Sequence, residues 1–202
     1  MEQLAGVIVS WLIRQEAIEE ESRELYEYAV HSFFLGITPL IYAVIIGGLM
    51  GEVRTSITLI FPFMIIRKFS GGFHAKREWV CLVSSCLLLC GCIFTASHIE
   101  HNVLFDAIVI WAVVSLIVCS PIDSENRRLE PDEKKLRKKE TTIISLFFYI
   151  VYIGLLFLGK QSYAICIGTG MILTAGLQVP CIIKNIAKKC RKMSFHDTRI
   201  EK

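Results

Sequence analysis

The chain of 202 residues lacks the sequence patterns that mark several common classes of protein. It has no CxxC pair and no HExxH motif, so a zinc site would need ligands from distant loops, and we expect neither a metal nor another cofactor. It has no internal repeat and no low-complexity tract. No cleavable signal peptide is visible, because the N-terminus is acidic and the first long apolar run starts near Phe33. We therefore expect any entry into a membrane to use internal apolar segments.

Apolar residues, by contrast, are abundant. They make up 53% of the chain, and the mean hydropathy is +0.53. Soluble domains are usually about 45–50% apolar. The composition therefore predicts a polytopic membrane protein. Of the eight cysteines, most lie in or at the ends of apolar runs and no small secreted domain surrounds them, so we expect reduced thiols.

Six apolar runs follow one another along the chain. They cover residues 32–50, 53–66, 80–97, 103–120, 141–158 and 163–183. Because about 20 residues of helix cross the hydrocarbon core of a bilayer, we predict an all-α fold with about six transmembrane helices. The second run is short and contains Pro62, so it is either a tilted short span or a re-entrant segment.

Residues 1–30 carry apolar side chains at alternating steps of three and four, which predicts one amphipathic helix before the first span. Its polar face is acidic and would oppose binding to anionic lipid. We expect this helix to pack on a partner helix or on the body of the protein.

The distribution of positive charge predicts the topology. With six spans and both termini on one side, that side receives all of the 22 Lys and Arg residues except Arg54 and Lys160. Short cytoplasmic loops hold such an excess, so we place both termini in the cytoplasm. The predicted organisation is a cytoplasmic amphipathic helix at 1–30, a six-span membrane domain at 31–183 and a basic cytoplasmic tail at 184–202. The membrane domain contains a polar loop at 67–81 and a basic loop at 121–140, both cytoplasmic.

The basic loop contains a helix start. Pro131 can open a helix that has Asp132 and Glu133 in its first turn and continues into the fifth span. Five cations follow in that helix, namely Lys134, Lys135, Arg137, Lys138 and Lys139. They form either a solvated anchor that faces lipid headgroups or a docking site for a substrate.

The polar loop at 67–81 combines four cations, the pair Gly71-Gly72, His74 and Cys81 between two very apolar segments. A cysteine reacts as the thiolate, which a nearby base, cation or helix N-terminus favours. If the third span begins near Glu78, Cys81 lies in its first turn. Seven residues of continuous helix rise roughly 10 Å, so His74 can reach Cys81 only from a loop that folds back, and two glycines permit such a fold.

The spacing of these residues alone does not decide between a catalytic and a purely structural role. A His-x6-Cys pair is a weak signal, and a cysteine at the top of an apolar helix is usually a packing residue. Glu78 is four residues from His74 and either orients it or is a carboxylate favoured at a helix start. Cys86 and Cys90 are interpreted as packing groups rather than resolving thiols.

The run from Arg67 through Gly71-Gly72-Phe73-His74-Ala75 to Cys81-Leu82 and Ser84 resembles the signature of the AgrB family, the membrane cysteine endopeptidases of bacterial peptide quorum sensing. The stretch from Pro121 to Arg127 also resembles a segment of that family, and the six apolar runs extend the likeness over nearly the whole chain. The resemblance implies that Cys81 and His74 are the catalytic pair. It also implies that activity needs Arg67 and Gly72.

The resemblance further implies a location in the bacterial cell membrane and an AgrD-like propeptide as substrate. Cys81 would cleave off the charged C-terminal tail of the propeptide and hold the remainder as a thioester, which an internal Cys or Ser would close to a thiolactone or lactone. The partners expected are this propeptide and the lipid bilayer, with no nucleic acid, and a homodimer is left open.

Two other functions compete with this one. A small peptide transporter would place ionisable residues or broken helices near mid-membrane, whereas Asp106, Gln178 and Pro180 lie near the ends of their predicted spans. A non-catalytic membrane scaffold would depend on the basic residues 134–139 and not on Cys81.

Overall fold

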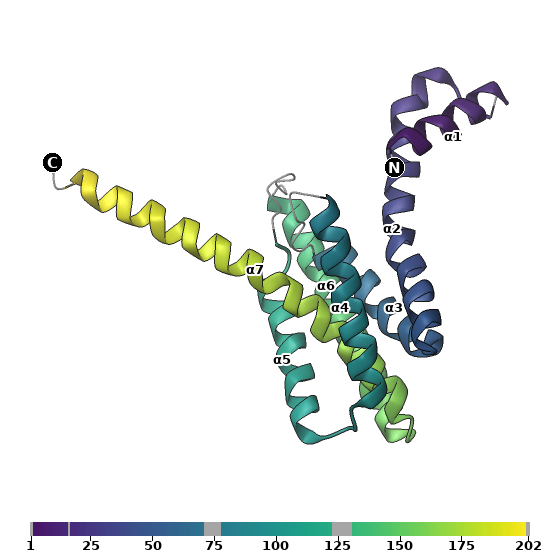
Figure 1. Ribbon diagram of the computed structural model, residues 1–202. Helices are drawn as coiled ribbons and strands as arrows, with labels where there is room; N and C mark the ends of the chain where they lie inside the picture. The colour runs from purple at the N-terminus through teal and green to yellow at the C-terminus, as the bar shows by residue number, and fades with distance from the viewer. Residues whose placement is uncertain (1, 16, 71–77, 123–130, 201–202) are drawn as a thin grey trace.

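The computed structural model of the chain describes residues 2–15, 17–70, 78–122 and 131–200, with the backbone alone described at 2–4, 35, 78–82, 131 and 184–200. The described part is helical and contains no strand, which confirms the all-α prediction. Its elements are α1 (Glu2–Arg14), a 3₁₀ turn η1 (Glu20–Ser22), α2 (Arg23–Met50), α3 (Val53–Ser70), α4 (Glu78–His98), α5 (Val103–Cys119), α6 (Pro131–Phe157) and α7 (Gln161–Ile200) (Figure 1).

Each of the six predicted apolar runs lies in one of the helices from α2 to α7. Three segments of the described chain are long and apolar enough to cross a membrane: Glu20–Met50, Asp132–Phe157 and Gln161–Ile183. Val83–His98 and Val103–Cys119 are shorter apolar helices. The helices therefore form the bundle expected of an all-α membrane protein.

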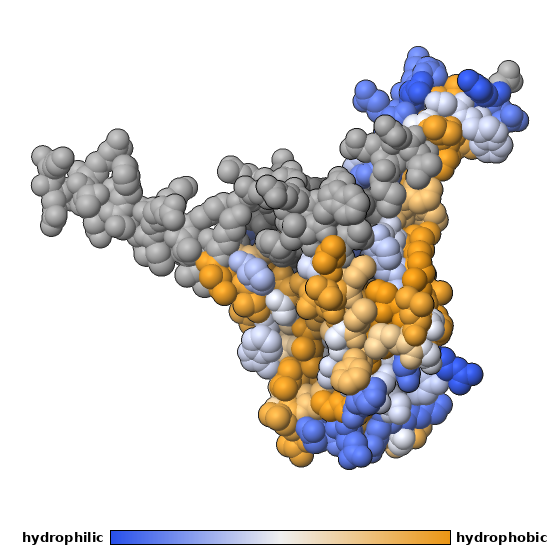
Figure 2. Space-filling model, viewed as in Figure 1, coloured by the Kyte–Doolittle hydropathy of each residue, from blue (hydrophilic) through white to orange (hydrophobic). Residues whose placement is uncertain are grey.

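Large apolar side chains cover the outside of this bundle. Leu49 is 84% exposed and Phe157 is 89% exposed, and many other Leu, Ile, Val and Phe side chains are also exposed. Figure 2 shows hydrophobic residues over the middle of the visible face, whereas hydrophilic residues gather at its lower end and around α1. A soluble monomer rarely exposes so much apolar surface, so this band is typical of a helical membrane protein.

The doubtful second run forms a continuous helix. Pro62 lies inside α3, which has 18 residues and is therefore roughly 27 Å long. The helix packs against α2, α4, α6 and α7, and its residues Leu59, Ile60, Phe63 and Ile66 belong to the core. The structure thus makes α3 one continuous helix of the bundle, and its assignment as a tilted span or as a re-entrant segment stays a prediction.

Close packing around α7 depends on small residues. A Cβ at Gly170 would collide with the backbone carbonyl of Leu59 in α3, and a Cβ at Gly168 would meet the rings and methyl groups of Phe105 and Val109 in α5. The backbone of α7 therefore approaches both neighbours, and its residues 164–171 are buried. In a membrane, where helices gain little from the hydrophobic effect, such close contact supplies the packing energy.

Local residues account for several of the helix ends. Gly51 has φ 74° and Gly159 has φ 71°, and each follows the last turn of its helix, α2 and α6 respectively. Asn102 caps α5 by accepting a hydrogen bond from Phe105 N at 2.9 Å. The helix predicted to open at Pro131 and to continue into the fifth span is confirmed as α6.

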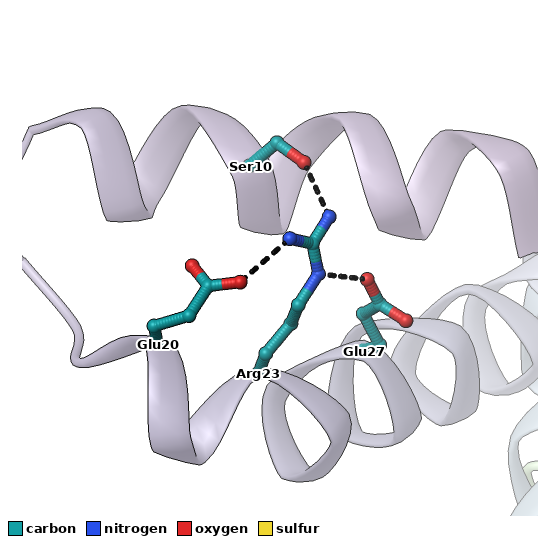
Figure 3. Close-up of polar contacts among 4 residues, drawn as sticks. All are labelled: Ser10, Glu20, Arg23 and Glu27. Carbon is teal, nitrogen blue, oxygen red and sulfur yellow. Dashed lines mark hydrogen bonds and ion pairs between the residues drawn. The ribbon is translucent and has the colours of Figure 1, made fainter.

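The prediction of one amphipathic helix over 1–30 is wrong. α1 ends at Arg14, and a new helix begins at Arg23 and continues without a break through the first apolar run. α1 folds back onto the start of α2, where Arg23 bonds to Ser10 (3.0 Å), Glu20 (2.8 Å) and Glu27 (3.0 Å) (Figure 3). The reversal buries Ala5 and Val9, which a straight helix would leave exposed. Of the two packing partners expected, the segment thus uses the body of the protein.

Two further expectations concern the cysteines and the C-terminus. The cysteines whose side chains are described form no disulfide with one another; they are Cys86, Cys90, Cys92, Cys119, Cys166 and Cys181. Cys86 and Cys90 pack partly buried against the core, as the packing interpretation predicts. The tail predicted from residue 184 continues the helix α7 to Ile200.

Candidate active site

The predicted catalytic loop joins α3 to α4. α4 begins at Glu78, so Cys81 is its fourth residue and lies in the first turn, as predicted. Gly71, Gly72 and His74 lie outside the described residues, as do the side-chain surroundings of Glu78 and Cys81. The pairing of His74 with Cys81 and the orienting role of Glu78 therefore stay predictions.

Arg67 lies in the last turn of α3, immediately before this loop. Its side chain is partly buried, and the guanidinium carbon is 5.6 Å from the centre of the Phe63 ring. This is within the range of a cation–π interaction. Phe63 thus holds the Arg67 side chain along α3, at the end of the helix from which the loop departs.

Three buried polar residues tie the ends of α3 and α5 to α7. Ser70 is the last residue of α3, and its carbonyl oxygen accepts a hydrogen bond from Ile122 N at 3.1 Å. Gln178 Nε2, in α7, donates to Ser120 Oγ at 2.8 Å and lies 3.5 Å from the same Ser70 oxygen. We call Ser70, Ser120 and Gln178 the polar junction. It fixes the point at which the chain leaves α3 towards His74.

A groove of about 420 Å³ opens beside the polar junction. Its apolar lining comes from Val118, Cys119 and Pro121 at the end of α5, and its cations are Lys134, Lys135 and Lys138 in α6. Ser120 belongs both to the groove lining and to the polar junction. The groove therefore combines positive charge with an apolar wall, close to the end of α3.

The groove divides the five cations predicted to dock a substrate. Lys134, Lys135 and Lys138 lie on the face of α6 that lines it, whereas Arg137 and Lys139 are not part of the lining. Arg137 instead pairs with Glu133 at 3.6 Å, and both side chains are about one-third exposed or less. Lys134 and Lys138 are four residues apart and share a face of α6, whereas Lys139, although four residues after Lys135, is not part of the lining.

A second polar cluster lies in the first turn of α5. His101 Nε2 is 2.8 Å from Asp106 Oδ1, and the Tyr152 hydroxyl of α6 donates to the same oxygen. Fourteen residues of helix separate Asp106 from Ser120, a rise of roughly 21 Å. This cluster is therefore remote from the polar junction, at the other end of α5.

The sequence did not indicate the role of Gln178. It is noticeable as an amide in an apolar run, two residues before Pro180, but its partners lie 58 and 108 positions away. No pattern of neighbouring residues in the sequence predicts a contact over such distances.

The apolar outer surface of the helices and the basic groove at the ends of α5 and α6 define a helical integral membrane protein with a charged site at one end of its bundle. The sequence model of the family Accessory gene regulator B (AgrB) matches residues 5–182. The chain belongs to this family.

Individual relatives agree with the match. A putative AgrB-like protein of Clostridium perfringens (strain SM101 / Type A) is 23% identical over 90% of both chains. Accessory gene regulator protein B of Staphylococcus lugdunensis is 23% identical over 76% of this chain and 78% of its own. Protein FsrB of Enterococcus faecalis (strain ATCC 47077 / OG1RF) is 19% identical over 94% of this chain and 79% of its own. No solved structure matches the chain. Membership of the family implies a part in processing the peptide of the accessory gene regulator quorum-sensing system.

Proposed function

We propose that the protein is a membrane cysteine endopeptidase that removes the C-terminal tail of an AgrD-like propeptide and promotes its cyclisation. The observation that carries the proposal is the place of Cys81, in the first turn of α4 within a chain of this family. The N-terminus of a helix carries a partial positive charge, which stabilises a thiolate there by about 0.3–1 kcal/mol. Cys81 is therefore well placed for a nucleophile, and His74 is its proposed base.

The reaction proceeds in two acyl transfers. The Cys81 sulfur attacks the carbonyl carbon of the scissile peptide bond, and His74 gives the proton it took from the thiol to the departing amine of the tail. This leaves a thioester between Cys81 and the remaining propeptide. An internal thiol or hydroxyl of the propeptide then attacks the thioester carbonyl, closes a thiolactone or lactone ring and returns the thiol of Cys81. With an internal thiol, one thioester replaces another, so little free energy is needed if water is kept out.

The groove supports a docking site for the tail. Lys134, Lys135 and Lys138 supply positive charge that suits an acidic peptide, and Val118 and Pro121 supply an apolar wall. The groove adjoins the polar junction, at the end of α3. In this proposal Lys139 and Arg137 instead face lipid headgroups or other parts of the protein. The charge distribution of the sequence places the groove and the loop at the cytoplasmic face, where the propeptide is made.

The test is propeptide cleavage by the purified chain in liposomes, followed by mass spectrometry of the tail and of the cyclic product. Cys81→Ala and His74→Ala should each abolish cleavage while leaving membrane insertion unchanged. Cys86→Ala, which changes a packing cysteine one to two turns further along the same helix, should cleave normally. Normal cleavage by Cys81→Ala would refute the proposal and favour a transporter or a scaffold.

A further inference from the structure

Gln178 is the central residue of the polar junction. Its side chain is fully buried in α7, yet it contacts the ends of two other helices. We propose that Gln178 is a positioning residue of the active site, which fixes the end of α3 and thereby the path of the chain from Ser70 to His74. This inference rests on the proposed function.

The orientation of the amide follows from its partners. The Ser70 carbonyl can only accept hydrogen bonds, so the amide group that faces it is the nitrogen, and the two N–H bonds of Nε2 match two acceptors. The Ser120 bond is short at 2.8 Å and the Ser70 contact is longer at 3.5 Å. Ser120 is therefore the stronger anchor. Through it and the Ile122 bond to the Ser70 carbonyl, α7 holds both helix ends.

Packing stability does not account for this amide. Gln178 Oε1 is buried and has no hydrogen-bond partner within the described part of the chain. A buried polar atom without a partner costs free energy, whereas a methionine would fill a similar volume without that cost. The amide thus reduces stability at one atom and gains only the two contacts to the helix ends. The role of the Gln178 amide is therefore to fix the position of the end of α3.

The position of this helix end matters for catalysis. Ser70 directly precedes Gly71 and stands four residues before His74, while Cys81 is fixed in the first turn of α4. α4 itself packs on α3 and α7. A displacement of about 1 Å between catalytic groups can cost roughly 100-fold in rate. Gln178 therefore acts on the distance between His74 and Cys81 through the end of α3.

The first experiment compares Gln178→Met with His74→Ala and with the control Thr174→Val in the full-length protein. Thr174 is one turn earlier on α7 and is also buried, but among the described residues its hydroxyl bonds only to Gly170 O of its own helix, at 2.8 Å. The readouts are kcat and KM for propeptide cleavage, the thermal midpoint of unfolding, and the rate of alkylation of Cys81 by iodoacetamide against pH, measured on the peptide that contains Cys81. The last readout reports the thiolate independently of any substrate.

Gln178→Met should lower kcat roughly 10- to 100-fold with KM nearly unchanged. It should also move the alkylation profile of Cys81 towards that of His74→Ala, whereas Thr174→Val should change neither. If His74→Ala shifts the alkylation profile and Gln178→Met does not, the positioning role is wrong and the proposed function stands. If His74→Ala neither shifts the profile nor slows cleavage, the proposed function itself fails.

A second variant covers the case in which Gln178→Met does not fold. Ser120→Ala removes only the hydroxyl that accepts the 2.8 Å bond. It should lower kcat about tenfold or less and move the alkylation profile in the same direction. An unchanged profile in Ser120→Ala overturns the inference. Where both variants fold, the effect of Ser120→Ala should disappear in the Gln178→Met background, because both remove the same bond, and additive effects would contradict the proposed link.

Discussion

The side-chain nitrogen of Gln178 lies 2.8 Å from the hydroxyl oxygen of Ser120, across 58 residues of sequence. Through this bond the end of α5 is fixed to α7, and the bond from Ile122 N to the Ser70 carbonyl joins the end of α3 to the same place. The loop with His74 leaves from Ser70, and Ser120 also lines the groove with its three lysines. The end of α3, from which the loop with the proposed base His74 departs, and the proposed tail site are thus both anchored at Gln178 of α7.

The groove predicts a difference between two adjacent lysines. Lys138→Glu should raise KM for a propeptide with an acidic tail by about two- to fivefold, because it reverses one charge in the groove at an exposed position where an ion pair contributes roughly 0.2–1 kcal/mol. Lys139→Glu makes the same charge change outside the lining and should leave KM unchanged. Cleavage kinetics measure both, and kcat should not change in either variant.

Salt provides an independent check of the same groove. An exposed ionic contact is screened at a Debye length of about 8–10 Å near physiological ionic strength, so KM of the unmodified protein should rise with added salt, and less so for Lys138→Glu. Equal effects of Lys138→Glu and Lys139→Glu would mean that the basic run acts through its overall charge on the membrane surface and not through the groove.

Gly170 tests the packing of α3 on α7. Gly170→Ala should destabilise the protein by about 1–3 kcal/mol, because the added methyl group meets the rigid backbone carbonyl of Leu59. Gly154→Ala is the control, since nothing lies within 4 Å of a Cβ at that position in α6. It should be neutral or slightly stabilising, as alanine has a higher helix propensity than glycine. Unfolding in detergent, followed by circular dichroism, gives both values, and equal stability of the two variants would contradict the close approach.

Much of the bundle could be predicted from the sequence because a membrane helix is recognised from residues close together in the chain. The six apolar runs and the helix start at Pro131 each depend on residues close together in the chain. Cys81 in the first turn of α4 follows from the same kind of signal.

The remaining features depend on contacts between distant residues. The apolar residues on both sides of the reversal between Arg14 and Arg23 have the spacing of one straight helix. The sequence pattern therefore does not show the reversal, and only the burial of Val9 against α2 reveals it. The division of Lys138 from Lys139 requires knowing which face of α6 meets α5. Gln178 finds its partners on two other helices. In each case periodicity predicts the helix but not the neighbour.

The cluster of Asp106, His101 and Tyr152 should contribute to stability and not to catalysis. Tyr152→Phe removes a hydrogen bond to a carboxylate from a side chain that is 1% exposed, and we expect a loss of roughly 1.5–3 kcal/mol. Tyr149→Phe is a suitable control, because the Tyr149 hydroxyl makes no hydrogen bond to the described residues. The kcat of folded Tyr152→Phe should match that of the unmodified protein, since the cluster is roughly 21 Å of helix away from Ser120. A selective fall in kcat would instead give this end of the bundle a part in the reaction.

The fold of α1 onto α2 should depend on Arg23. Its guanidinium bridges Ser10 of α1 and the carboxylates of Glu20 and Glu27, but the side chain is 41% exposed, so the ion pairs are expected to contribute only about 1 kcal/mol or less. Arg23→Met should therefore leave the unfolding midpoint of the bundle almost unchanged, while amide hydrogen exchange in residues 5–14 becomes up to about fivefold faster. Arg14→Met removes a cation that is exposed and forms no ion pair with the described residues, and it should leave exchange unaltered. If Arg23→Met does not accelerate exchange, the buried contacts of Ala5 and Val9 are sufficient to hold α1, and the polar bridge follows from the fold rather than fixing it.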